Sequence, residues 1–129
     1  IIICPPNKNA KDLFKHLGTI IEMRNEKTSY RFWSTASIMA AFYEILNVSS
    51  NWLVKKGIKK TISNNYIAEL FLSLSQDAAN KHSQGFKKLV KDSQTPKGLN
   101  MQVLKELQRN KFYSKFFKAL ENVNKRVSK

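Results

Sequence analysis

Apolar residues recur at helical spacing along the segment from Ile62 to Val90. The steps between them are three, four and seven residues, so a helix places them on one face. The members of this stripe are Ile67, Phe71, Leu74, Ala78, Gly85 and Leu89. The pattern predicts a long helix over about 62–91 whose stripe belongs to the core, and Gly85 within it predicts that another backbone comes close.

A second long helix is predicted over about 30–56, ending before Gly57. Between Phe32 and Val54 its only charged residue is Glu44, and apolar residues occupy most of its circumference. Scattered Ser and Asn residues argue against a transmembrane span, which needs about 20 mostly apolar residues. We therefore expect a core helix that is covered on most sides.

The remaining segments complete an all-α, single-domain bundle of about five helices over residues 1–129, built on the two long antiparallel helices. Residues 1–8 read as an extended arm because Pro5 and Pro6 forbid a helix start. A helix follows from Asn9 to about Ile21. The composition around Thr95-Pro96 and Gly98 predicts a turn, a short helix over about 99–109 and a last helix over about 111–125.

The last helix separates an aromatic face from a basic one. Bulky apolar residues of this kind lie either against a core or in a membrane interface, among acyl chains. With an aromatic residue of the second helix, the candidate membrane-binding residues are Phe112, Tyr113, Phe116, Phe117, Leu120 and Trp33.

Charge points to a polyanionic partner. Lysine and arginine total 23 against 9 acidic residues, a net charge of +14. The predicted basic surface consists of Lys55, Lys56, Lys59, Lys60, Lys87, Lys88, Lys91, Lys111, Lys115 and Lys118. Nucleic acid is the least favoured partner, because base readers favour arginine and this chain is mostly lysine in its basic residues.

Catalytic patterns are absent from the sequence. Cys4 is the single cysteine and lies on a proline-bounded arm, and the two histidines, His16 and His82, are far apart. Neither a metal-ligand spacing nor a glycine-rich phosphate loop occurs. We predict no metal, no cofactor and no enzymatic activity.

In its helical layout the chain resembles the abalone sperm acrosomal proteins, lysin and its fusagenic paralogue. The first long helix closes with Trp52-Leu53, three residues and Gly57, as in that family. His82 lies about as far before the turn at Thr95-Pro96 as the histidine of the family's long second helix does. Leu104 then leads through Arg109 and Lys111 to Phe116-Phe117 and Leu120, so the likeness covers about residues 31–123. The many lysines and the extra amino-terminal segment favour the fusagenic paralogue.

This resemblance implies a secreted protein of the sperm acrosomal vesicle that acts in fertilisation without catalysis, as a monomer or a homodimer. The expected function is to bind and merge sperm and egg membranes through anionic lipid. The alternatives are lysin-like disruption of the egg vitelline envelope by binding an acidic coat glycoprotein and, last, a nucleic-acid-binding helical domain.

Overall fold

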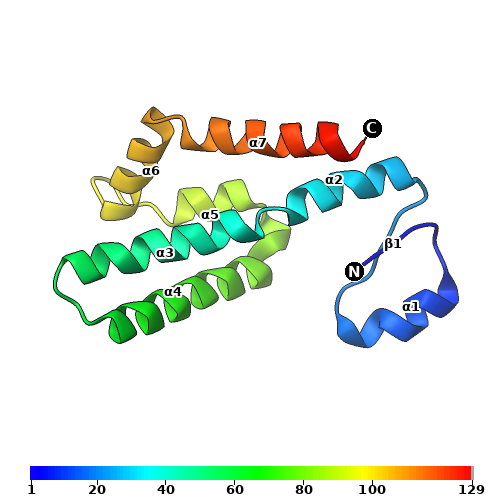
Figure 1. Cartoon of the computed structure of the whole chain (residues 1–129), viewed down its shortest axis with the longest axis horizontal. Coiled ribbons are helices and arrows are strands. Elements are labelled where there is room, and N and C mark those ends of the chain that lie inside the picture. The colour runs from blue at the N-terminus through cyan, green and yellow to red at the C-terminus, as the bar shows by residue number, and fades with distance from the viewer. Residues whose placement is uncertain (129) are drawn as a thin grey trace. The chain divides into compact units, whose positions relative to one another are not determined.

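The computed structural model describes residues 1–128 and separates into two compact units. The first unit contains Ile1–Ile38 and the C-terminal segment from Ser114, and the second is Met39–Tyr113. Both are predominantly helical, so the predicted all-α class is confirmed (Figure 1). A single domain over the whole chain stays a prediction.

The first unit begins with a short parallel pair of strands. β1 (Ile2–Ile3) lies beside β2 (Ile21–Glu22), with the N–H of Met23 donating to the carbonyl of Ile3 at 2.9 Å. Between them lie α1 (Lys8–Phe14) and the 3-10 turn η1 (Lys15–Leu17). The predicted helix over 9–21 is therefore too long, because Gly18 has φ +144° and turns the chain into the strand.

The first unit also contains α2 (Glu26–Ala36) and most of α7 (Phe112–Val127). Asn25 caps α2 by accepting the N–H of Lys27 at 2.8 Å. The two helices meet at the buried hydroxyl of Ser34, whose Oγ lies 2.8 Å from the carbonyl oxygen of Tyr30 and 3.4 Å from Oδ1 of Asn124.

The predicted helix over 30–56 is two helices. α2 ends at Ala36, and α3 (Met39–Lys55) begins after a break. Three hydroxyls before the break bond backbone carbonyls: Thr35 bonds that of Arg31, Ser37 that of Ser34, and Ser34 that of Tyr30. Such local bonds compete with the helical ladder and favour helix bends and ends, which explains an interruption that apolar periodicity does not reveal.

The second unit is organised around a hairpin of α3 and α4 (Lys60–Lys81) (Figure 1). The chain reverses at Gly57, whose φ of +91° suits glycine. Small polar residues lie where the helices meet: Ser63 is fully buried, Ser50 is buried, and Ser50 Oγ donates to Asn64 Oδ1 at 2.6 Å. Small side chains let the two backbones approach closely.

The predicted helix over 62–91 is also interrupted. After α4 come the 3-10 turn η2 (His82–Gln84) and α5 (Phe86–Asp92), and the break lies at Gly85, with φ +80°. Apart from Gly85 and its two chain neighbours, no atom of residues 1–128 lies within 4 Å of where a Cβ of Gly85 would be, so the predicted close approach of another backbone is wrong. The predicted helix over 99–109 is confirmed as α6 (Leu99–Arg109).

The chain covers little of its own apolar surface. Ile3 and Ile67 are the buried apolar side chains of residues 1–128. Within the predicted core stripe of α4 and α5, Phe71, Ala78 and Leu89 are half-buried and Leu74 is 57% exposed. The expectation that α3 is covered on most sides is not met within this chain, since its Met39, Tyr43, Val48 and Trp52 are exposed.

We expect Ser63→Leu to lower the free energy of unfolding by about 1–3 kcal/mol, because the added methylene groups must be forced between α3 and α4. Ser63→Ala is the control and should cost below about 1 kcal/mol, since the Lys59 carbonyl that Ser63 Oγ bonds also accepts the Ser63 backbone N–H. Urea unfolding followed by circular dichroism at fixed protein concentration measures both. Equal losses in the two variants would contradict close packing at this position.

Candidate dimerisation surface

The hairpin has an inner face that joins its two helices. The rings of Phe42 and Phe71 meet edge to face, with centroids 5.9 Å apart, and Ile67 is buried beside them on α4. A small groove remains on the hairpin, lined by Leu46, Ser50 and Asn64 among others. The inner face therefore combines one aromatic contact with a polar contact between serine and asparagine, which together hold the helices in register.

The opposite side of α3 carries an apolar stripe that its unit leaves partly exposed. Ile45, Val48 and Trp52 follow one another at three and four residues, so they share a face turned away from Leu46 and Ser50. Val48 is 57% exposed and Trp52 59% exposed. We call Ile45, Val48 and Trp52 the α3 outer stripe.

α4 repeats this arrangement on its own outer side. Ile62 and Tyr66 lie one turn apart and face away from Ile67 and the hairpin seam, and both are more than half exposed. Single exposed apolar residues are ordinary on protein surfaces, but rows of large ones on neighbouring helices mark interaction sites. The hairpin thus offers a partner two apolar edges.

Beside the α3 outer stripe lies a row of polar side chains that bond one another. Asn47 Nδ2 donates to Glu44 Oε2 at 3.1 Å, and Asn51 Nδ2 donates to Asn47 Oδ1 at 2.9 Å. A polar group that already has a hydrogen-bond partner is less costly to cover than a free one. Covering this side of α3 is therefore less costly than covering the same amides without these bonds.

The residues of the predicted membrane-binding face lie on two helices, α2 and α7. Trp33 on α2 is exposed and contacts the ring of Tyr30, with centroids 5.3 Å apart. At the start of α7 the rings of Phe112 and Tyr113 meet edge to face at 5.3 Å, and farther along Phe117 is 65% exposed. Phe116 and Leu120 are half-buried. Contacts with neighbouring residues therefore bury only part of the aromatic face of α7.

The predicted basic residues are all exposed and fall into separate groups. Lys55, Lys56, Lys59 and Lys60 gather at the turn between α3 and α4, where the Lys56 ammonium lies 5.7 Å from the centre of the Trp52 ring. Lys87, Lys88 and Lys91 lie on α5, where Lys105 of α6 joins them around a groove. Lys111 precedes α7, and Lys115 and Lys118 lie on it.

Two pKa values in the first unit depart from their ordinary range. The hydrogen bond and charge of Glu22, whose Oε2 lies 2.6 Å from Lys11 Nζ, raise the pKa of Lys11. Burial, aided by the Glu26 carboxylate, raises the pKa of Tyr30. Both shifts favour the ordinary neutral-pH forms, a protonated lysine and a neutral tyrosine. The stabilising effect of the Lys11 contact is complete below the ordinary lysine pKa and is lost as the pH rises through the raised value.

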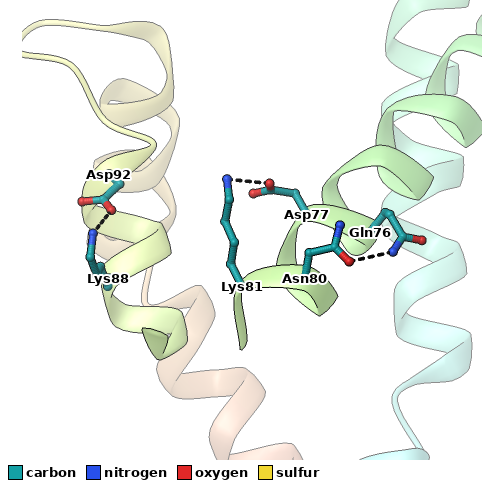
Figure 2. A network of polar contacts seen from close by, with 6 residues as sticks. All are labelled: Gln76, Asp77, Asn80, Lys81, Lys88 and Asp92. Atoms are coloured by element: carbon teal, nitrogen blue, oxygen red, sulfur yellow. Dashed lines mark hydrogen bonds and ion pairs between the residues drawn. The ribbon is translucent and has the colours of Figure 1, made fainter. Parts of the chain in front are cut away.

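Several polar side chains on the surface of the second unit pair with a partner on the same helix. Figure 2 shows Asp77 with Lys81, 2.6 Å apart, and Gln76 with Asn80 on α4, and Lys88 with Asp92 on α5. Each pair joins residues four apart, which supports its own helix by a few tenths of a kcal/mol. In residues 1–128 no group of three or more His, Cys, Asp or Glu side chains is placed to hold a metal ion.

A helical chain with so little interior and with apolar rows along its central hairpin has the features of a domain that associates with another protein surface. Residues 32–129 match the family described as pyrroline-5-carboxylate reductase dimerisation. The match covers 98 of the 129 residues, and the chain belongs to this family.

Two solved structures share its fold. Pyrroline carboxylate reductase of Plasmodium falciparum, solved with NADP bound, has a TM-score of 0.76 and 22% identity. A pyrroline-5-carboxylate reductase from Coxiella burnetii has the same TM-score and 19% identity. Each likeness covers 94% of this chain but 46% of the other, so the chain spans about half the length of these proteins. Among curated protein sequences none matches this chain.

These findings overturn the resemblance to the sperm acrosomal proteins. The family match replaces it, and the predicted fusagenic and envelope-disrupting functions and the secreted acrosomal location are wrong with it. The prediction of a non-enzymatic protein is also wrong, because the matched family is the dimerisation part of a reductase. In residues 1–128 no helix is both long and apolar enough to cross a membrane.

The sequence patterns did not single out the residues of the hairpin's outer sides. Val48 has a signal, since it repeats with Ile45 and Trp52 at steps of three and four residues, and Ile62 and Tyr66 are four apart. The low charge of α3, however, also fits a core helix of the same chain. That Trp33, the aromatic face of α7 and the ten lysines of the predicted basic surface form binding surfaces stays a prediction. The family match gives no support to membranes or egg-coat glycoproteins as their targets.

The hairpin seam generates a prediction about Phe42 and Phe71. In a double-mutant cycle, Phe42→Ala and Phe71→Ala should couple by about 0.5–1.5 kcal/mol, because each substitution alone removes the same ring contact. Urea unfolding of the two single variants and the double variant measures the coupling. Strictly additive losses would show that these rings do not hold the helices together.

Proposed function

We propose that this chain is the dimerisation part of a pyrroline-5-carboxylate reductase and pairs with a second copy of itself through the α3–α4 hairpin. The observation that carries the proposal is the exposure of the α3 outer stripe together with the family match over 32–129. A domain with Ile3 and Ile67 as the buried apolar residues of its described part has too small a core to be stable alone. A second copy of the chain covers the exposed apolar residues of the hairpin.

The chemistry of α3 supports this occupant. From Phe32 to Val54 the only charged residue is Glu44, and its carboxylate already accepts a bond from Asn47. Each copy carries a net charge of +14, so two copies repel, and an interface forms most favourably where lysines are absent. α3 between its ends is such a segment, whereas the α3–α4 turn and α5 are not.

The symmetry of a pair makes the α3 outer stripe sensitive to a single change. In a two-fold dimer the same patch occurs on both copies, so one substitution acts twice. Interfaces of this kind depend on a few large apolar anchors, and tryptophan is the residue most enriched among them. Trp52, 59% exposed, is the largest side chain on the stripe.

We expect Val48→Asp to raise the dimer dissociation constant at least about 100-fold, because an unpaired carboxylate would be buried once on each copy. Val48→Thr keeps the shape and should have an effect several times smaller. Mass by light scattering across a dilution series measures the shift. Leu99→Asp on α6 is the matched control, since Leu99 is 80% exposed and outside the stripe. A monomer for the unchanged protein, or equal weakening by Leu99→Asp, would refute the proposed interface.

We further propose that the protein containing this chain reduces pyrroline-5-carboxylate with a nicotinamide cofactor. Consumption of NADPH that depends on added pyrroline-5-carboxylate should therefore be detected in the purified protein. Val48→Asp should reduce it in proportion to the dimer lost, and raising the protein concentration should restore it by mass action. A dimer with no such activity would reject the catalytic proposal and leave the dimer proposal intact.

A further inference from the structure

The second unit holds a basic groove between α5 and α6. It has a volume of about 660 Å³ and is lined by four lysines and three glutamines around Val90 and Leu104. The lysines are Lys87, Lys88 and Lys91 of α5 and Lys105 of α6. The two helices are tied where they are joined, because Asn100 Nδ2 donates to the carbonyl of Ser93 at 2.9 Å.

The positive charge of this groove is not neutralised by its own surroundings. Lys88 forms an ion pair with Asp92 on the same helix (Figure 2). Lys87, Lys91 and Lys105 have no carboxylate partner in the part of the chain that the structure describes. Lys87 and Lys91 lie four residues apart on one helix, an arrangement that repels and destabilises the helix slightly. An anionic occupant would relieve this repulsion.

We propose that the α5–α6 groove binds an acidic peptide segment of another protein. Lysine ammonium groups along the rim complement aspartate and glutamate, and glutamine amides provide both donors and acceptors for a peptide backbone. Val90, 47% exposed, and Leu104 offer apolar contact to the intervening side chains of the same peptide.

Charge and residue type distinguish this occupant from two others. A second copy of the chain carries a net charge of +14 and does not complement the groove. The lining contains no arginine, the residue whose planar fork recognises phosphate bidentately, so a nucleotide or nucleic acid is the poorer match. The apolar floor also has no counterpart on a phosphate chain.

The test measures fluorescence anisotropy with a fluorescein-labelled peptide of Glu-Glu-Leu-Asp repeats, added to the purified dimer. The peptide should bind, more weakly as salt rises, and Lys87→Glu with Lys91→Glu should weaken it at least about tenfold. Val90→Thr should weaken it about threefold, because it exchanges apolar contact for a hydroxyl. The matched control is Lys59→Glu with Lys60→Glu, which makes the same charge change at an exposed helix start outside the groove and should stay within about twofold.

Three outcomes would overturn the proposal. If the control pair weakened peptide binding equally, the peptide would be attracted to the overall charge of the protein and not to the groove. Tighter binding of an oligodeoxythymidine or of inorganic triphosphate would identify a phosphate site. A loss of dimer mass in Lys87→Glu with Lys91→Glu would show that the groove is an interface between copies. Circular dichroism of each variant checks that it remains folded. Light scattering of the unchanged protein and of Val48→Asp tests the dimer separately, so a failure of peptide binding is distinguishable from a failure of the dimer proposal.

Discussion

The structure depends on apolar helix surface that this chain does not cover by itself. Folding stability comes mainly from removing such surface from water, and the conformational entropy lost on ordering a chain is of similar size. In residues 1–128 the buried apolar side chains are Ile3 and Ile67, while Trp52 and Val48 on the central hairpin face outward. In the proposed dimer a second copy covers this surface, and folding and association would then be one process.

This constraint explains the polar seam of the hairpin. Ser50 Oγ donates to Asn64 Oδ1 and so joins α3 to α4, and the small side chain of fully buried Ser63 lets the two helices approach closely. Next to this polar contact the seam holds the Phe42–Phe71 ring pair and buried Ile67, while Val48, Trp52, Ile62 and Tyr66 lie on the outer sides. The hairpin therefore keeps one ring contact and one buried isoleucine for its own stability and leaves other large apolar residues available to the proposed dimer.

Several helices could be predicted from the sequence, and the errors have physical causes. α6 was predicted at its observed bounds because Gly98 and Asn110 flank a clear apolar stripe. The breaks at Ser37 and Gly85 were missed because apolar periodicity continues across them, while hydroxyl bonds to the backbone and a positive φ interrupt the helix. The strand pair of Ile3 with Glu22 escaped prediction because two-residue strands leave no periodic signal.

The error in the predicted function has a related cause. A Trp-Leu closure before glycine, a basic patch and an aromatic run are local features that many basic helical chains share, so their order supported the wrong family. The hairpin's outer residues could not be assigned because periodicity says which residues share a face and not what covers that face. Val48 and Trp52 have the same pattern whether the cover is another helix of the chain or another copy.

The apolar outer side of the α3–α4 hairpin and the basic groove between α5 and α6 differ in charge. Between Phe32 and Val54 a single carboxylate is present, so the electrostatic opposition to the proposed pairing there is mainly the long-range repulsion of two chains of +14 each. Salt screens that repulsion over about 8 Å at physiological ionic strength and therefore favours pairing. Around Lys87, Lys91 and Lys105 the same screening weakens the attraction of an acidic partner. The proposed dimer and the proposed peptide complex should thus respond to ionic strength in opposite directions, because water exclusion would hold the first and Coulomb attraction the second.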